Sequence, residues 1–242
     1  SLFIPEEGCQ WGVFDYSQQE PRLVVHYASL QKMYAVNDVL DAYQDGNADF
    51  HQIVAEMAQI PREQAKTINL GLFYGMGKNK LQAELGVSKE KANDLFRQYH
   101  SRVPFVKQLM DSVMARAQDR GKVRTLLGRL CRFHLWEPNQ FGIHKPLPHD
   151  AALLEHGPGI RRAFTYKALN KLIQGSAADM TKKAMIELHK EGIIPHIQVH
   201  DELDISVNNN ADKIKEIMES AVELEVPNKV DYESGPNWGT IK

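Results

Sequence analysis

The stretch Trp11-Gly12-Val13-Phe14-Asp15-Tyr16-Ser17-Gln18-Gln19-Glu20-Pro21-Arg22 decides the fold of this 242-residue chain. Its first four residues form a short apolar run that stops at Asp15, which predicts a strand with a carboxylate at its end. Pro21 is tolerated in the first turn of a helix, so we expect a helix to begin close to it, with helical patterning to about Leu40. The stretch therefore predicts an acidic side chain held where a strand meets a helix.

A second acidic turn lies in the last quarter of the sequence. Two β-rich runs, 193–199 and 203–207, flank His200-Asp201-Glu202, a pattern typical of two strands joined by a tight turn. A lone aspartate at a strand end or in a turn is more often a helix cap or an ordinary turn residue. The prediction of a site therefore depends on Asp15 and Asp201 together.

Paired carboxylates suit phosphoryl transfer, which needs in-line geometry and charge stabilisation on both sides of the phosphorus. Two Mg²⁺ ions about 3.5–4 Å apart supply that stabilisation, and such hard cations prefer oxygen ligands. We therefore expect Asp15 and Asp201 to bridge two Mg²⁺ ions. The carbonyl of Tyr16 is a further candidate ligand, and Glu202 is expected to have a supporting catalytic role.

A cationic helix is predicted from Pro61 to Tyr74, where Arg62, Lys66, Leu70 and Tyr74 are spaced four apart and so share one face. Two cations one turn apart can hold a β,γ-phosphate pair, and Lys66 can donate a proton to the leaving pyrophosphate. The aromatic ring of Tyr74 offers a surface for base stacking. For an isolated helix, a solvated face with Tyr74 in the core is the more common situation.

Charge is distributed unevenly along the chain. The net charge is −2, with 43% hydrophobic and 25% charged residues, as in an ordinary globular protein. Residues 62–132 hold 15 Lys/Arg and 6 Asp/Glu, a net of +9 that leaves −11 for the remainder. A basic region beside an acidic one fits a polyanion-binding surface next to a metal site, although a solvated helical surface gives the same asymmetry.

Membrane and secretory classes are not expected. No run approaches the roughly 18 apolar residues of a membrane span, and residues 1–7 lack the features of a signal peptide. The only cysteines, Cys9 and Cys131, have no metal-like spacing. We expect a cytoplasmic protein with no membrane partner.

Two of these motifs resemble those of family A DNA polymerases, the DNA polymerase I type. Asp15 to Arg22 looks like the first palm motif, DYSQxExR, and Gln198-Val199-His200-Asp201-Glu202 resembles the third, QVHDE. The resemblance implies an α+β fold, with an antiparallel right-hand palm and mainly helical fingers, in which both aspartates bind the catalytic metals. It also implies that Glu20 is a steric gate against the 2′-hydroxyl and that Gln18 lies at the nucleotide.

The cationic helix is similar to the fingers helix of the same family. The resemblance implies that Arg62 and Lys66 contact the triphosphate, that Lys66 is the general acid and that Tyr74 stacks near the nascent pair. His51 resembles the histidine that contacts the incoming phosphates, and it lies only eleven residues before Arg62 in the sequence, which looks like the bacteriophage branch. If the chain is phage-encoded, the expected location is the cytoplasm of a bacterial host. Leu70 departs from the family, which usually has Phe or Tyr against the incoming sugar.

Further resemblances concern DNA. Asn170 and Gln174 match an asparagine and a glutamine that touch the primer-template minor groove, where amides suit the nearly degenerate pattern of acceptors. Thr125 to Arg129 is similar to the family's TLxGR segment, which makes Arg129 a backbone-contact candidate, and His200 is also a DNA-binding candidate. Tyr166 stands near where bacterial relatives have Arg, so the DNA contact of that arginine is not expected here.

These resemblances divide the chain into three predicted parts: palm over 1–40, fingers over 41–120, and palm continuation over 121–242. Within the last part, the Pro- and Gly-rich stretch 134–159 is predicted to be a long surface loop or insertion. The remaining elements that we expect are helices over 48–58, 88–119 with a break at Pro104, 160–190 and 211–225, and strands over 122–127, 130–133 and near 229–232.

The predicted function is template-directed DNA synthesis by a two-metal-ion mechanism, with primer-template DNA and dNTPs as partners. An N-terminal thumb or exonuclease portion is expected to lie outside this chain. Two alternatives stay open: a relative of single-subunit RNA polymerases, and a DNA-binding polymerase subunit that is inactive without a missing chain. Glu20 and Glu202 argue against the first alternative. The joint presence of four residues argues against the second: Asp15, Asp201, Arg62 and Lys66.

Overall fold

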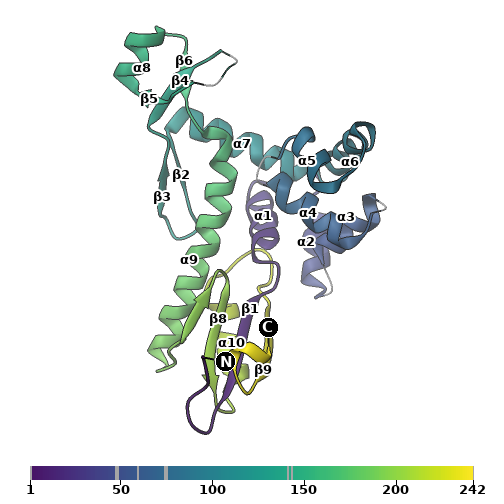
Figure 1. Ribbon diagram of the computed structural model, residues 1–242, viewed down its shortest axis with the longest axis vertical. Coiled ribbons are helices and arrows are strands. Elements are labelled where there is room, and N and C mark those ends of the chain that lie inside the picture. The colour runs from purple at the N-terminus through teal and green to yellow at the C-terminus, as the bar shows by residue number, and fades with distance from the viewer. Residues whose placement is uncertain are drawn as a thin grey trace.

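The computed structural model describes residues 2–46, 49–58, 60–73, 76–140, 142 and 144–241 (Figure 1). A four-stranded antiparallel sheet lies at one end, a cluster of helices projects to one side, and a small three-stranded sheet lies at the other end. The long helix α9 (Ala168–Lys190) runs along the molecule from the small sheet to the large one (Figure 1). This mixed helical and antiparallel architecture confirms the predicted α+β fold.

The large sheet has the strand order β7-β8-β1-β9, all antiparallel. Its strands are β7 (Ile197–Val199), β8 (Glu202–Val207), β1 (Gln10–Tyr16) and β9 (Val230–Gly235). β1 runs one residue beyond the predicted end at Asp15, because Tyr16 pairs with Val230 and its buried hydroxyl donates to the Met218 carbonyl at 2.6 Å. The central strand therefore joins residues from distant parts of the chain.

Three helices pack against α9 and form the main core with it. They are α1 (Gln19–Leu30), α7 (Pro104–Arg120) and α10 (Ala211–Ser220). Pro104 begins α7, as predicted, and α10 ends five residues before its predicted end at 225. The core continues into the large sheet through side chains such as Phe14, Leu203 and Ile205. One continuous apolar core thus fixes the sheet relative to α9.

The helical cluster contains five helices among the described residues: α2 (Asn37–Gln44), α3 (Phe50–Ala58), α4 (Arg62–Phe73), α5 (Lys78–Leu85) and α6 (Lys89–Arg102). Ser88 caps α6 by accepting a hydrogen bond from the Lys91 amide at 3.2 Å, which confirms that predicted start. Helix α5 was not predicted. Tyr74, at the predicted end of the cationic helix, lies outside the described residues.

The stretch 134–159 was predicted to be a long surface loop or insertion, and the prediction of a loop was wrong. It contains β4 (Leu135–Pro138), β5 (Leu147–Pro148) and α8 (His149–His156), and β4 pairs with β5 and with β6 (Ile160–Arg162). The Arg162 guanidinium lies over the Trp136 ring at 4.5 Å, and Arg161 pairs with Glu137 at 3.1 Å. These contacts between strands hold a small sheet together despite its many prolines and glycines.

Other boundaries also differ from the prediction. Residues 160–167 are not α-helical, since β6 is followed by the short 3-10 helix η1 (Thr165–Lys167) before α9 begins. The two predicted strands around Gly128 form a shorter hairpin, β2 (Lys122–Arg124) and β3 (Leu130–Arg132). The chain ends, within the described part, in the 3-10 turn η2 (Trp238–Thr240).

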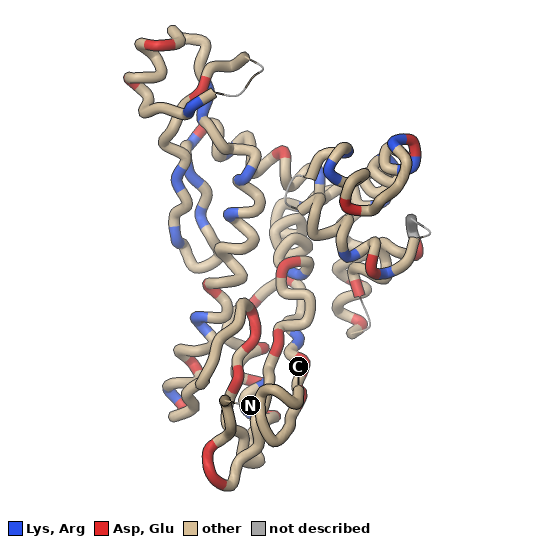
Figure 2. Tube along the Cα trace, in the orientation of Figure 1, with Lys and Arg blue, Asp and Glu red and all other residues tan. Residues whose placement is uncertain are grey.

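Basic and acidic side chains separate in space (Figure 2). Lys and Arg gather along the β2–β3 hairpin and the adjoining end of α7, whereas Asp and Glu gather on the large sheet (Figure 2). Over the part of the chain that the structure describes, no helix combines the length and apolar character that crossing a bilayer requires. The charge asymmetry seen in the sequence therefore corresponds in part to the basic β2–β3 hairpin and the acidic large sheet.

Candidate functional site

One cleft of about 860 Å³ lies between the large sheet, the helical cluster and α9. Its walls come from the end of β1, the start of α1, helices α3 and α4, the middle of α9 and the β7–β8 turn. It gathers most of the predicted site residues: Asp15, Tyr16, Gln18, Glu20, His51, Arg62, Lys66, Leu70, Gln174, His200 and Asp201. Segments as distant as α4 and the β7–β8 turn thus meet in one place.

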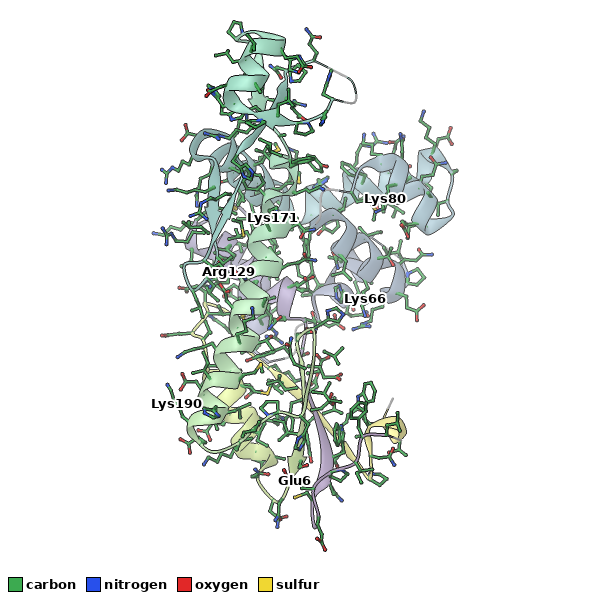
Figure 3. All side chains as sticks on the ribbon, turned by 60° about the vertical axis from the view of Figure 1, so that its left-hand side comes forward. Glu6, Lys66, Lys80, Arg129, Lys171 and Lys190 are labelled. Carbon is green, nitrogen blue, oxygen red and sulfur yellow. The ribbon has the colours of Figure 1, made fainter. Side chains whose placement is uncertain are left out.

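Some predicted residues do not line this cleft. Glu202 begins β8 beside Asp201, and Asn170 lies one turn before Gln174 on α9. Arg129 lies on the hairpin side of α9, away from Lys66 (Figure 3). Its guanidinium bonds the Asp179 carboxylate at 3.0 Å and the Gly175 carbonyl at 2.6 Å. Arg129 therefore holds the hairpin on α9 in this structure.

Three acidic residues stand in a row across the large sheet. Asp15 on β1 is directly opposite Glu202 on β8 and Asp231 on β9, so the three share one face. Like charges in directly opposite positions destabilise a sheet. Asp201 joins this row at the turn, where His200 adopts a left-handed φ of 55°. The arrangement concentrates negative charge where the sheet meets the cleft.

This acidic edge fits a divalent cation. Burial raises the pKa of the Asp201 carboxyl, and nearby Glu202 raises it further. A bound cation would offset both effects, and carboxylate and carbonyl oxygens are the ligands that Mg²⁺ prefers. Among the described residues no three His, Cys, Asp or Glu side chains form a ready-made metal cage. The candidate ligands are therefore the Asp15 and Asp201 carboxylates with the Tyr16 carbonyl.

The acidic edge leads to a prediction about stability. A raised pKa means that ionised Asp201 destabilises the folded state, and this effect vanishes below the unfolded value of about 3.9. We expect Asp201→Asn to raise the free energy of unfolding by about 1 kcal/mol near neutral pH, and by less as the pH falls towards about 4. Urea unfolding at both pH values measures this difference, and equal stabilisation at both would contradict the assignment.

Mg²⁺ binding is expected to raise the free energy of unfolding of the wild-type protein more than that of the Asp201→Asn variant. MgCl₂ at ten times its dissociation constant should stabilise the wild-type protein by about 1.4 kcal/mol, since the ion binds only the folded state. The Asp201→Asn variant should gain little, because one charged ligand is lost. The exposed Asp212→Asn substitution on α10 is the matched control and should leave the response to MgCl₂ unchanged.

A cationic wall faces the acidic edge. Lys66 is exposed on α4, on the side of the helical cluster towards the large sheet (Figure 3). Arg62, one turn earlier, is half-exposed and pairs with Asp49 at 2.6 Å. The buried imidazole of His51 on α3 lines the cleft together with these two cations. Positive side chains and acidic ligands thus flank one space, as binding of a metal-complexed triphosphate requires.

Gln18 connects the two walls of the cleft. Its Oε1 accepts hydrogen bonds from the Tyr43 hydroxyl at 3.2 Å and from the Phe50 amide at 2.9 Å, so it satisfies the start of α3. Arg22 fixes the same turn from inside, since its Nε donates to the Ser17 carbonyl at 2.8 Å and its guanidinium lies over Tyr43. The turn between β1 and α1 and the helix that carries His51 are therefore held together.

Helix α9 serves two surfaces. Gln174, Ala177 and Ala178 face the cleft, whereas Ser176 and Asp179 receive the β2–β3 hairpin. A Cβ at Gly175 would lie 2.6 Å from Thr125 Cγ2, so glycine permits this close approach. The hairpin therefore packs directly on the helix that forms one wall of the cleft.

Sequence reasoning missed two residues that shape the site. Asn69 on α4 is fully buried against His51, and the Gln198 side chain donates to the His200 carbonyl at 2.7 Å, which supports the acidic turn. The signal for Asn69 was present in the sequence, because an amide stands among the apolar residues Ile68, Leu70 and Leu72 of a predicted helix.

Comparisons with known proteins agree with this geometry. The family model described as DNA polymerase family A matches residues 1–240. A DNA-directed DNA polymerase of Pseudomonas phage M6 is 35% identical, over 99% of this chain and 40% of the phage protein. DNA polymerase I of Geobacillus stearothermophilus is 34% identical, over 99% of this chain and 27% of that protein.

A solved structure gives the same result. The POL domain of Pol1 from M. smegmatis, in complex with DNA primer-template and dNTP, is similar with a TM-score of 0.75 and 28% identity, over 97% of this chain and 41% of that chain. The chain therefore spans less than half the length of these relatives. Because the family model matches nearly every residue and relatives from phage and bacteria align along the whole length, this chain belongs to DNA polymerase family A.

Proposed function

We propose that this chain carries the catalytic centre of a template-directed DNA polymerase, which adds deoxynucleotides to a primer 3′ end by a two-metal-ion mechanism. The observation that supports it best is the cleft in which two carboxylates face Arg62 and Lys66. Asp15 lies near the end of β1, and Asp201 lies in the turn before the neighbouring strand β8. When bound, two Mg²⁺ ions would stabilise charge on the attacking and leaving oxygens. The Asp15 and Asp201 carboxylates and the Tyr16 carbonyl would hold them.

The protein side chains have separate tasks in this proposal. Arg62 and His51 hold the incoming triphosphate, and Lys66 both binds it and donates a proton to the pyrophosphate as it leaves. Gln18 is a nucleotide-binding candidate, although its Oε1 is engaged with the start of α3. Tyr74, which is expected to stack near the nascent pair, completes the set.

Primer-template DNA is the proposed second ligand. Gln174 reaches the cleft from α9 and is proposed to test the minor groove, where an amide can bond every correct pair. His200 lies at the acidic turn, and Asn170 and Arg129 are further DNA-binding candidates outside the cleft. The basic hairpin surface would contact phosphates, so we expect duplex affinity to fall steeply with salt.

Primer extension tests the proposal. We expect extension with dNTPs and Mg²⁺ and little with rNTPs, because Glu20 lies in the cleft as the proposed gate against a 2′-hydroxyl. Glu20→Ala should raise rNTP incorporation relative to dNTP by roughly 10–100-fold, since a gate of a few atoms is removed. The exposed Glu90→Ala substitution on α6 is the control.

The possible outcomes separate the candidate functions. Extension with rNTPs by the wild-type protein would identify a relative of RNA polymerases. Retained DNA binding without extension by either nucleotide would identify a DNA-binding subunit that needs another chain. If the wild-type protein extends primers with dNTPs and Glu20→Ala does not raise rNTP incorporation, the polymerase proposal is supported and Glu20 is not the gate.

Leu70 provides a further prediction. It lies half-buried in the cleft, on the same face of α4 as Lys66, and lacks the flat ring that its family usually places against the sugar. Leu70→Phe is expected to change the ratio of dideoxy- to deoxynucleotide incorporation, because the ring contacts the site of the missing 3′-hydroxyl. Steady-state incorporation of both substrates measures it, and indistinguishable ratios for the two proteins would refute the role of Leu70.

A further inference from the structure

The buried amide of Asn69 is poorly explained by packing. Asn69 is fully buried in the middle of α4, where asparagine is a weak helix former. Its Nδ2 lies 2.9 Å from His51 Nδ1, and its Oδ1 has no hydrogen-bond partner among the described residues. A buried polar atom without a partner destabilises the fold. A leucine would suit this core better, so the amide must be accounted for by what it does to His51.

His51 is held firmly at the start of α3. Its backbone amide donates to Asp49 Oδ1 at 2.9 Å, and its ring is 5% exposed at the wall of the cleft. Burial lowers the pKa of His51; Asp49 opposes this effect, whereas Arg62 and Lys66 add to it. The ring is therefore neutral at the pH values near 8 at which nucleotide binding would be measured.

A neutral imidazole has one N–H donor, and the hydrogen bond at one ring nitrogen decides which nitrogen carries the proton. An amide N–H directed at Nδ1 makes Nδ1 an acceptor and leaves the proton on Nε2. If the amide were turned over, Oδ1 would accept from Nδ1–H, and Nε2 would present only a lone pair. Phosphate oxygens are acceptors, so only the first arrangement lets neutral His51 bind a triphosphate.

We propose that Asn69 is a positioning residue that fixes His51 in the Nε2–H tautomer, so that His51 donates a hydrogen bond to the triphosphate of the incoming nucleotide. The identity of the ligand rests on the proposed function above, whereas the tautomer does not. The proposal also accounts for the location of Asn69 on the same helix as Arg62 and Lys66. One helix then supplies two phosphate ligands directly and orients a third.

Long-range ¹H–¹⁵N NMR of the full chain labelled with ¹⁵N-histidine tests the tautomer without any need for activity. The chain has ten histidines, so the His51→Ala spectrum identifies the signals of His51. We expect a protonated Nε2 and an unprotonated Nδ1 in the wild-type protein. Asn69→Asp should move the proton to Nδ1, because a carboxylate can only accept. Asn93→Asp, on helix α6, is the matched control and should leave His51 unchanged. A wild-type Nδ1–H signal would overturn the proposal.

Calorimetric titration of dGTP in the presence of MgCl₂ tests the consequence. Asn69→Leu should weaken dGTP binding roughly tenfold, as expected for loss of one hydrogen bond to a charged group. In the His51→Ala background, the same substitution should have no further effect, which a purely structural role would not predict. Equal losses in both backgrounds would overturn the nucleotide role of Asn69. If wild-type protein does not bind dGTP, the proposed function fails, while the NMR result still decides the tautomer.

Discussion

Asp201→Ala is expected to reduce primer extension at least about 10³-fold, which corresponds to roughly 4 kcal/mol of transition-state stabilisation. The reason is that Asp201 and Asp15 are the two carboxylates of the acidic edge that line the cleft, where we propose that they hold the metal ions. Single-turnover extension of a labelled primer at saturating dNTP measures the effect. Asp15→Ala, on the neighbouring strand, should give a loss of similar size.

The control for this experiment is Asp212→Ala, which removes an exposed carboxylate from α10 that does not line the cleft. Because ionised Asp201 destabilises the folded state, the Asp201→Ala protein should remain folded, and urea unfolding checks that it does. Undiminished extension by a folded Asp201→Ala protein would show that the metals bind elsewhere and would remove the central support for the proposed function.

Lys66→Ala is expected to lower kcat by about 10²–10⁴-fold, the usual range for loss of a positioned general acid. Lys66→Arg separates its two tasks, because arginine keeps the positive charge but does not release a proton. We therefore expect Lys66→Arg to restore most of the dNTP affinity and little of kcat. Rapid-quench measurements over a range of dNTP concentrations give both quantities.

A second lysine provides the comparison. Lys89→Ala removes an exposed ammonium group from the start of α6 and should leave kcat and KM within twofold of the wild-type values. If Lys66→Arg recovers kcat fully, Lys66 acts through its charge alone. If Lys66→Ala changes only KM, the general acid must be sought elsewhere in the cleft.

Much of the fold could be predicted because several of its elements have recognisable patterns in the local sequence. The strand before Asp15, the turn at Asp201 and the helix from Arg62 each have a distinct local pattern of residues. The structure places all three around one cleft. The error over 134–159 has a physical cause: the small sheet depends on contacts such as Arg162 with Trp136, which no local pattern contains. A composition rich in proline and glycine looks the same whether or not such contacts exist.

The finer structure of the site depended on partners distant in the sequence. Gln18 was predicted to lie at the nucleotide, yet its Oε1 bonds Tyr43 and Phe50, which are 25 and 32 residues away. Arg129 was predicted to contact DNA, yet it pairs with Asp179, 50 residues away. Their roles with ligands stay predictions. Hydrogen bonds over such separations follow from tertiary packing, which neither motif spacing nor residue type reveals.

The position of β1 at the centre of the large sheet has a consequence for biosynthesis. Both of its strand partners come from the last part of the described chain, and Tyr16 bonds Met218 across a separation of 202 residues. A ribosome adding 5–20 residues per second needs roughly 10–40 s to span that interval. Throughout this time the apolar side chains of Trp11 and Phe14 lack their native cover, and both edges of the strand lack partners. The nascent chain is therefore expected to bind chaperones at β1, and the proposed metal ligands Asp15 and Asp201 can come together only after the β7–β8 turn has been made.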